Sequence, residues 1–108
     1  MSVKLHDLAH CLLEVEAELR RLGWWSEQAP HAAALASREP FCLDTLRFEQ
    51  WLQWVFLPRM HALIRESGDL PQHSAITEMA EVSYMEILGK TVVLRRHLKR
   101  LDRLLSRE

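Results

Sequence analysis

Several residue types that identify common classes of small protein are scarce in this chain of 108 residues. There are only two cysteines, Cys11 and Cys42, and they form no Cys-x-x-Cys pair. Two isolated cysteines provide neither a disulfide framework nor the paired spacing of a zinc finger. Because the first residues also do not resemble a secretory signal, we expect reduced thiols and a cytoplasmic location.

Glycine and long apolar runs are scarce as well. The three glycines are dispersed and cannot build a glycine-rich phosphate-binding loop. No apolar run approaches the roughly 20 residues that span a bilayer, so no membrane span is expected. With 48% hydrophobic residues the chain is long enough for one core, and residues 1–108 are predicted to form a single domain.

Leucine periodicity predicts the first and the last helix, near residues 3–22 and 90–105. Steps of three and four residues place the apolar side chains of each helix on one face. Gly23 stands where a helix C-terminal cap is expected. The residues predicted to face inward are Leu5, Leu8, Leu12, Val15, Leu19 and Leu22 in the first helix, and Thr91, Leu94, Leu98, Leu101 and Leu105 in the last.

The most apolar stretch predicts a helix near residues 44–66, capped by Asp44 or Thr45. Its apolar side chains nearly surround the helix, which indicates burial by several neighbours and a central position. Pro58 lies in its middle, where the missing N–H and the ring disturb the preceding turn, so we expect a kink there. The residues that recur at helical intervals are Leu46, Phe48, Trp51, Leu52, Val55, Met60, Leu63 and Ile64.

The remaining segments complete an all-α fold. One helical turn is predicted near Ala32–Leu35, and the segment 39–41 should be extended because Glu39 precedes a proline. A third, shorter helix is predicted near residues 75–87, with Ile76, Met79, Ala80, Val82 or Ser83, and Ile87 facing inward. The predicted fold is a small antiparallel four-helix bundle with a central, kinked apolar helix.

The central stretch also carries a family resemblance. The run Glu-Gln-Trp-Leu-Gln-Trp-Val-Phe-Leu-Pro-Arg-Met-His at residues 49–61, preceded by Glu-Pro-Phe at 39–41 and Asp-Thr-Leu at 44–46, resembles the YqcC-like family of small bacterial proteins. A looser resemblance extends through residues 75–81 and 98–105. It implies a small antiparallel helical bundle, a cytoplasmic location and a frequent gene-neighbour association with a tRNA pseudouridine synthase. It implies no catalytic residue, because the family has no assigned activity.

The aromatic residues around Pro58 predict a binding groove. Tryptophan is enriched at binding hot spots, and a bend at Pro58 would open a groove floored by Trp54, with Gln53 and Arg59 as polar anchors at its rim. Alternatively, the bend only steers the helix around an aromatic core. The residues of the predicted groove are Glu39, Phe41, Gln53, Trp54, Arg59 and His61.

The function that these features favour is a non-enzymatic interaction or adaptor module. The expected partner is a protein, and the family resemblance points to a tRNA pseudouridine synthase. The alternative is a small-molecule binder or unrecognised enzyme that uses a polar niche near Gln53, Arg59 and His61. The two differ in site shape, because a deep pocket with converging polar groups favours the alternative and a shallow apolar patch favours the module.

Basic residues concentrate near the C-terminus although the formal net charge is only −1. Two residues turn a helix by about 200°, so arginines that follow the leucine seam two residues later lie opposite it. Such a face is commonly just solvated, but it also suits phosphates or an acidic protein surface. No aromatic residues alternate with these arginines, which makes RNA the weaker expectation. The predicted basic face comprises Arg96, Arg100, Arg103 and Arg107.

No catalytic, cofactor-binding or metal-binding residue is assigned. His6 and His10 lie one helical turn apart, but the two further ligands that a structural metal needs are not evident. Asp44 and Glu49 are explained as a helix cap and a solvated partner for Arg47 or Gln53. The chain is expected to be a monomer or a weak homo-oligomer that needs no cofactor.

Overall fold

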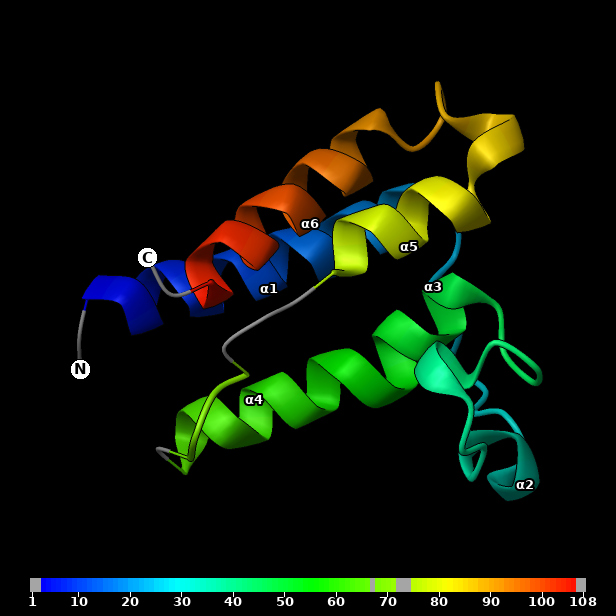
Figure 1. Ribbon diagram of the computed structural model, residues 1–108, viewed down its shortest axis with the longest axis horizontal. Coiled ribbons are helices and arrows are strands. Elements are labelled where there is room, and N and C mark those ends of the chain that lie inside the picture. The colour runs from blue at the N-terminus through cyan, green and yellow to red at the C-terminus, as the bar shows by residue number, and fades with distance from the viewer. Residues whose placement is uncertain (1–2, 67, 72–74, 107–108) are drawn as a thin grey trace.

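The computed structural model describes residues 3–66, 68–71 and 75–106. Every regular element within these residues is a helix or a helical turn, which confirms the all-α prediction. The longer helices are α1 (Val3–Arg21), α4 (Leu57–Arg65), α5 (Ile76–Ser83) and α6 (Val92–Leu105). They alternate in direction along the chain (Figure 1). In the described part of the chain, no helix combines the length and the apolar character needed to cross a membrane.

The helices α1 and α6 lie side by side and form the main seam of the core. Every leucine predicted to face inward from α6 is buried, and Thr91 is buried beside them. In α1 the residues Leu8, Leu12 and Leu19 are completely buried, whereas Leu5 and Leu22 at the ends are partly exposed. The helix ends as predicted, because Gly23 has a φ of 78° and the Trp24 N–H donates to the Leu19 carbonyl at 2.9 Å.

The predicted central position of the helix around Pro58 is wrong. The helix α1 contacts both α6 and α4, and α5 packs on α6. The helix around Pro58 therefore lies on one side of the other three (Figure 1). Its additional apolar surface is covered by its own upstream segment, because the Phe41 ring contacts the rings of Phe48 and Trp51. A nearly all-apolar helix does not need several helical neighbours if a loop covers one of its sides.

The third predicted helix is shorter than expected and buries a different face. The helix α5 ends at Ser83, and a 3₁₀ turn, η3 (Met85–Ile87), follows it. Ile76, Ala80 and Tyr84 are buried at steps of four, whereas Val82 is 65% exposed and Ile87 is 40% exposed. The inward positions predicted for Val82 and Ile87 are therefore wrong. Tyr84 takes the core position because its ring packs inside while its hydroxyl donates to Glu49 Oε1 at 2.9 Å.

The N-terminus of α5 is capped by a residue of α6. Ala75 precedes the helix and offers no capping side chain. Asp102 accepts hydrogen bonds at Oδ2 from the Thr77 N–H at 2.9 Å and from the Thr77 hydroxyl at 2.6 Å. A carboxylate at this place satisfies helix donors that would otherwise be unpaired. The contact fixes the relative position of α5 and α6.

The loop before the helix around Pro58 is ordered by its own polar contacts. The predicted turn is confirmed as α2 (Ala32–Leu35). Asp44 and Thr45 do not cap a helix, because the Ser37 hydroxyl donates to Asp44 Oδ1 and the Thr45 hydroxyl donates to the Ala34 carbonyl. The helix begins later, with α3 (Phe48–Trp51), and the Arg47 N–H donates to the Gln50 side chain at 2.8 Å.

The seam between α1 and α6 can be tested by truncating its leucines. Leu12→Ala and Leu98→Ala should each lower the free energy of unfolding by about 2–5 kcal/mol, because each leaves a cavity in a closed core. Leu13→Ala is the matched control: Leu13 neighbours Leu12 but is 58% exposed, and the change should cost less than about 0.5 kcal/mol. Urea unfolding measures all three, and equal losses at positions 12 and 13 would contradict the assignment of the buried face.

Candidate functional site

One continuous helix carries the candidate site. It runs from α3 through η2 (Leu52–Phe56) into α4, and η2 is a π-helical turn. The Leu57 N–H donates to the Leu52 carbonyl, five residues earlier in the chain. Pro58, which has no N–H to donate, follows directly. The irregularity predicted at Pro58 thus takes the form of a wider turn immediately before it.

The π turn determines which aromatic side chains share a face. Residues five apart in an α-helix point about 140° away from each other, but the wider π-helical turn brings them much closer to one face. Trp51 and Phe56 are five apart, and their rings stack with centroids 5.3 Å apart and an interplanar angle of 27°. Arg59 and Met60 lie on the same side of the helix as Trp51 and Phe56. The side chains of these four residues line one surface groove.

The groove has a volume of about 210 Å³, and its described lining is mostly apolar. Among the described residues that line it, Arg59 is the charged one, and it is exposed. A cation beside aromatic and aliphatic side chains suits a ligand that combines a bulky apolar group with a carboxylate. The lining residues are Phe41, Trp51, Phe56, Arg59, Met60, Pro71, Ala75, Ile76 and Leu105.

Phe41 reaches the groove from a strained turn. The 3₁₀ turn η1 (Pro40–Cys42) contains two successive residues in the left-handed region, Phe41 with φ 59° and Cys42 with φ 50°. Side chains other than glycine adopt this region rarely and at a cost. The Phe41 ring meets Trp51 edge-on at 4.7 Å, and Cys42 is buried, which offsets that cost. Of the segment predicted to be extended, only Glu39 is extended.

Gln53 does not lie at the rim of this groove, which corrects the prediction from the sequence. It is only 5% exposed, and its amide pairs with the backbone of Ser26. The Ser26 N–H donates to Gln53 Oε1 at 2.9 Å, and Gln53 Nε2 donates to the Ser26 carbonyl at 2.6 Å. Gln53 is therefore a clamp that fixes the segment after α1 to the helix around Pro58.

The other residues of the predicted groove are dispersed. Phe41 and Arg59 line it, but Trp51 forms its wall where Trp54 was predicted. Trp54 is partly buried, and its indole nitrogen is buried without a hydrogen-bond partner in the part of the chain that the structure describes. Glu39 is exposed and precedes η1, and His61 is partly buried elsewhere on α4. The predicted polar niche of Gln53, Arg59 and His61 is not assembled.

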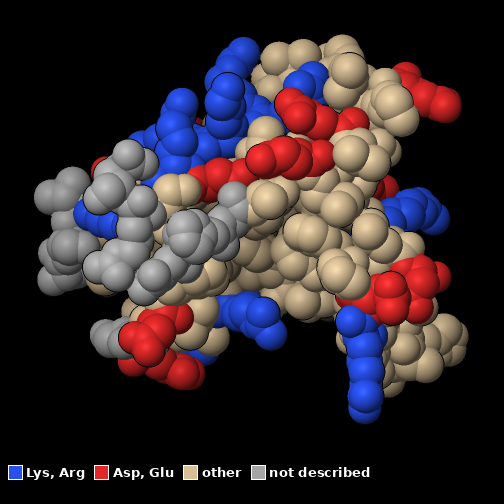
Figure 2. All heavy atoms as spheres, viewed as in Figure 1, with Lys and Arg blue, Asp and Glu red and all other residues tan. Residues whose placement is uncertain are grey.

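The predicted basic face is present on α6, and Figure 2 shows lysine and arginine side chains gathered there. Arg96 and Arg103 are exposed on the side opposite the buried leucines. Arg100 is turned toward α1, and its Nη1 lies 3.6 Å from Glu14 Oε1. Arg107 lies outside the described residues. The face thus consists of Arg96 and Arg103, together with Lys99.

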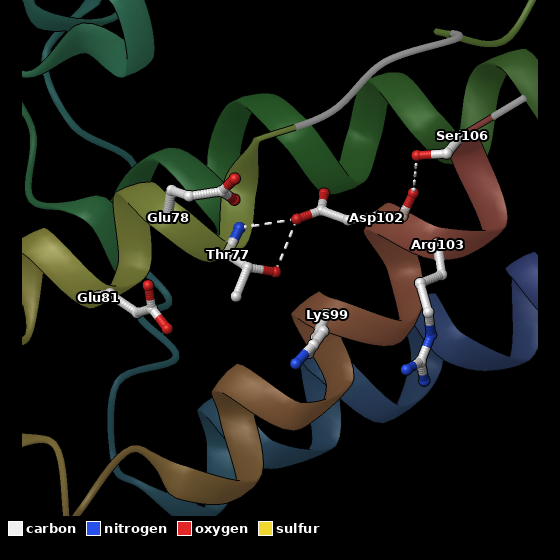
Figure 3. Close-up of a pocket in the computed structure, with 7 residues that line it drawn as sticks. All are labelled: Thr77, Glu78, Glu81, Lys99, Asp102, Arg103 and Ser106. Atoms are coloured by element: carbon white, nitrogen blue, oxygen red, sulfur yellow. Dashed lines mark hydrogen bonds between the residues drawn. The ribbon is translucent and has the colours of Figure 1, made fainter.

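A polar depression of about 440 Å³ lies on the surface where α5 and α6 meet (Figure 3). Glu78 and Glu81 line it from α5, and Lys99 and Arg103 line it from α6. Asp102 also lines it, but its carboxylate is occupied by Thr77. The depression therefore has acidic side chains on one side and basic side chains on the other.

Two tryptophans that follow α1 lie partly exposed with a cation over each ring. Lys90 Nζ is 5.3 Å from the ring centroid of Trp24, and the Arg20 guanidinium is 4.7 Å from that of Trp25. Cation–π contacts of this kind stabilise an exposed aromatic surface modestly. The sequence analysis did not anticipate these pairs, because Lys90 is far from Trp24 in the sequence and Arg20 approaches Trp25 only across the turn at Gly23.

The titratable side chains of the described residues form no recognisable reaction centre. No three His, Cys, Asp or Glu side chains in residues 3–66, 68–71 and 75–106 are grouped so that they could hold a metal ion. Cys11 is buried and donates to the His97 carbonyl at 3.3 Å, and burial raises the pKa of its thiol to about 11. A neutral, enclosed thiol is a poor nucleophile.

A small all-α protein with a shallow apolar groove is the class that these features define, and comparison with known proteins gives its family. The sequence profile of DUF446, described as "tRNA pseudouridine synthase C", matches residues 7–104. The chain therefore belongs to this family, which confirms the resemblance to YqcC-like proteins. An uncharacterized protein of Haemophilus influenzae is 40% identical over 75 residues, which cover 69% of this chain and 71% of the relative.

Two further relatives define the extent of the match. The uncharacterized protein YqcC of Escherichia coli is 31% identical over 102 residues, 94% of each chain. Its solution NMR structure superposes with a TM-score of 0.85 at 28% identity and covers 97% of this chain and 90% of that one. A "tRNA pseudouridine synthase C" of Pectobacterium carotovorum is 49% identical over 67 residues, which are 62% of this chain but only 18% of that protein.

The role of Gln53 as a clamp can be tested by substitution. Gln53→Ala should lower the free energy of unfolding by about 1–3 kcal/mol, because it leaves both backbone groups of Ser26 without their partner. Gln50→Ala offers a comparison on the exposed start of the same helix and should cost about 1 kcal/mol or less. Thermal and urea unfolding measure both, and a loss for Gln53→Ala no larger than that for Gln50→Ala would contradict the clamp.

Proposed function

We propose that this chain is a non-enzymatic interaction module that binds a tRNA pseudouridine synthase. The observation that carries the proposal is the groove of Phe41, Trp51, Phe56 and Met60 with Arg59 at its edge. The proposed occupant is a segment of the synthase with a bulky apolar side chain and a nearby carboxylate. Its apolar side chain would pack between Phe41 and Phe56 while its carboxylate pairs with the Arg59 guanidinium.

The form of the groove supports binding of a segment rather than chemistry. It is shallow, and the described residues that line it include no carboxylate, histidine or cysteine that could act as acid, base or nucleophile. Aromatic side chains and a single arginine are the composition found at binding hot spots. The long helices of the proposed antiparallel bundle would serve as the rigid support of this surface.

The choice of partner is supported by the comparisons. A region similar to this chain occupies part of a Pectobacterium protein named tRNA pseudouridine synthase C. Regions that occur within one chain in one organism and as separate chains in another commonly act together. The similar region makes up only 18% of that protein. As a separate chain, the present protein would then bind the synthase and take the place that this region has within the longer protein.

Binding to a purified tRNA pseudouridine synthase C tests the proposal, measured by biolayer interferometry. Arg59→Ala should raise the dissociation constant at least about tenfold, since an arginine that pairs with a carboxylate of the partner contributes about 1.4 kcal/mol or more. Arg59→Lys should restore part of the affinity, because it keeps the charge but not the paired hydrogen bonds. Both variants should unfold within about 0.5 kcal/mol of the wild type.

The matched control is Arg65→Ala, six residues further along the same helix. Arg65 is exposed and lies outside the groove, near Glu66. Its removal should leave the affinity unchanged. Absence of any binding by the wild-type protein, or equal loss for Arg59→Ala and Arg65→Ala, would refute the proposal.

A further inference from the structure

The outer face of α5 combines acidic and apolar side chains in one line. Glu78, Glu81 and Val82 follow one another at steps that place them on the same side of α5, and Met85 follows in η3, just beyond the end of that helix. This side lies opposite the buried residues of α5. Val82 is 65% exposed and Met85 is 66% exposed, which is unusual for side chains of this size. We call these four residues the α5 strip.

The outer face of α6 continues the same surface with the opposite charge. Leu88 and Val92 are exposed at its beginning. Arg96, Lys99 and Arg103 follow at steps of three and four, and all are exposed. These five residues form the α6 strip. Each strip is therefore apolar near the connection between α5 and α6 and charged at its far end.

The opposite charges of the two strips are not paired within the molecule. Glu78 and Glu81 face Lys99 and Arg103 across the polar depression of Figure 3. Among the described residues, no ion pair within 4 Å joins the two sets. Both signs are visible on one face of the molecule, as a basic area beside an acidic band (Figure 2). The charges are thus available to a partner.

We propose that this face is the interface between two copies of the chain. A two-fold axis parallel to α5 and α6 places α5 of one copy on α6 of the other. Glu78 and Glu81 then meet Arg103 and Lys99 of the second copy. The same operation places the exposed apolar side chains of both strips toward the same end of the interface. Every contact occurs twice, as an isologous interface requires.

The presence of acidic and basic side chains side by side on this face favours a second copy of the chain over other partners. A nucleic acid would meet the carboxylates of the α5 strip immediately beside the basic side chains, which reduces its attraction. A uniformly acidic protein surface would meet the same repulsion. A second copy presents both signs in the required places and also covers the exposed apolar ends. This interface lies apart from the groove of Phe41 and Arg59 and does not depend on the function proposed for it.

Sedimentation equilibrium of charge-reversed variants tests the interface at low salt, from low micromolar to about millimolar protein. The wild-type chain should self-associate. Glu78→Lys with Glu81→Lys should raise the dimer dissociation constant at least about tenfold, because like charges then face each other. Lys99→Glu with Arg103→Glu should do the same. An equimolar mixture of the two double variants should form a heterodimer, since it restores opposite charges across the interface.

Controls separate loss of the interface from general effects of charge. Glu66→Lys and Arg65→Glu reverse exposed charges at the end of α4, and they should leave self-association unchanged. Circular dichroism and unfolding confirm that each double variant is folded. A wild-type chain that stays monomeric throughout would overturn the proposal, as would double variants that fail to associate when mixed. Binding of a tRNA probe that is lost with Lys99→Glu and Arg103→Glu, without self-association of the wild type, would assign the basic side chains to RNA instead.

Discussion

Pro58, in the middle of a continuous helix, is the constraint on which the candidate site depends. The chain accommodates the missing donor with a π-helical turn, in which the Leu57 N–H bonds the Leu52 carbonyl. The extra residue in this turn brings Trp51 onto the side of the helix that carries Phe56 and Arg59. In an uninterrupted α-helix Trp51 and Phe56 would diverge by about 140°, and the aromatic wall of the groove would not form.

The groove keeps its shape because polar contacts tie the segments around it to the core. Gln53 fixes the segment after α1, and Asp102 fixes the start of α5, the helix that contributes Ile76 to the groove. Phe41 is held in its left-handed conformation by contact with Trp51. The seam between α1 and α6 supplies most of the buried apolar surface. The site is thus a surface on a closed core rather than an opening in it.

Much of the fold follows from helical periodicity, whereas the composition of the site does not. The seam from Thr91 to Leu105 and the end of α1 at Gly23 were correctly predicted, because local pattern determines them. Gln53 and Trp54 were misplaced because the groove was predicted from a bend at Pro58, whereas the helix forms a π turn that places Trp51 on the side of the groove. Tyr84 was missed although it continues the steps of four from Ile76 and Ala80, because the partner of its buried hydroxyl, Glu49, is 35 residues away in the sequence. Long-range polar partners leave no periodic signal.

The central claim is that the Trp51 and Arg59 side of the helix around Pro58 receives a segment of a tRNA pseudouridine synthase. An NMR titration of the isotope-labelled chain with that enzyme tests it most directly. The account predicts that resonances of the Trp51 indole and the Arg59 side chain change, while those of Leu13 and Arg65 stay in place. Changes confined to α5 and α6, or no change at saturating enzyme, would contradict it.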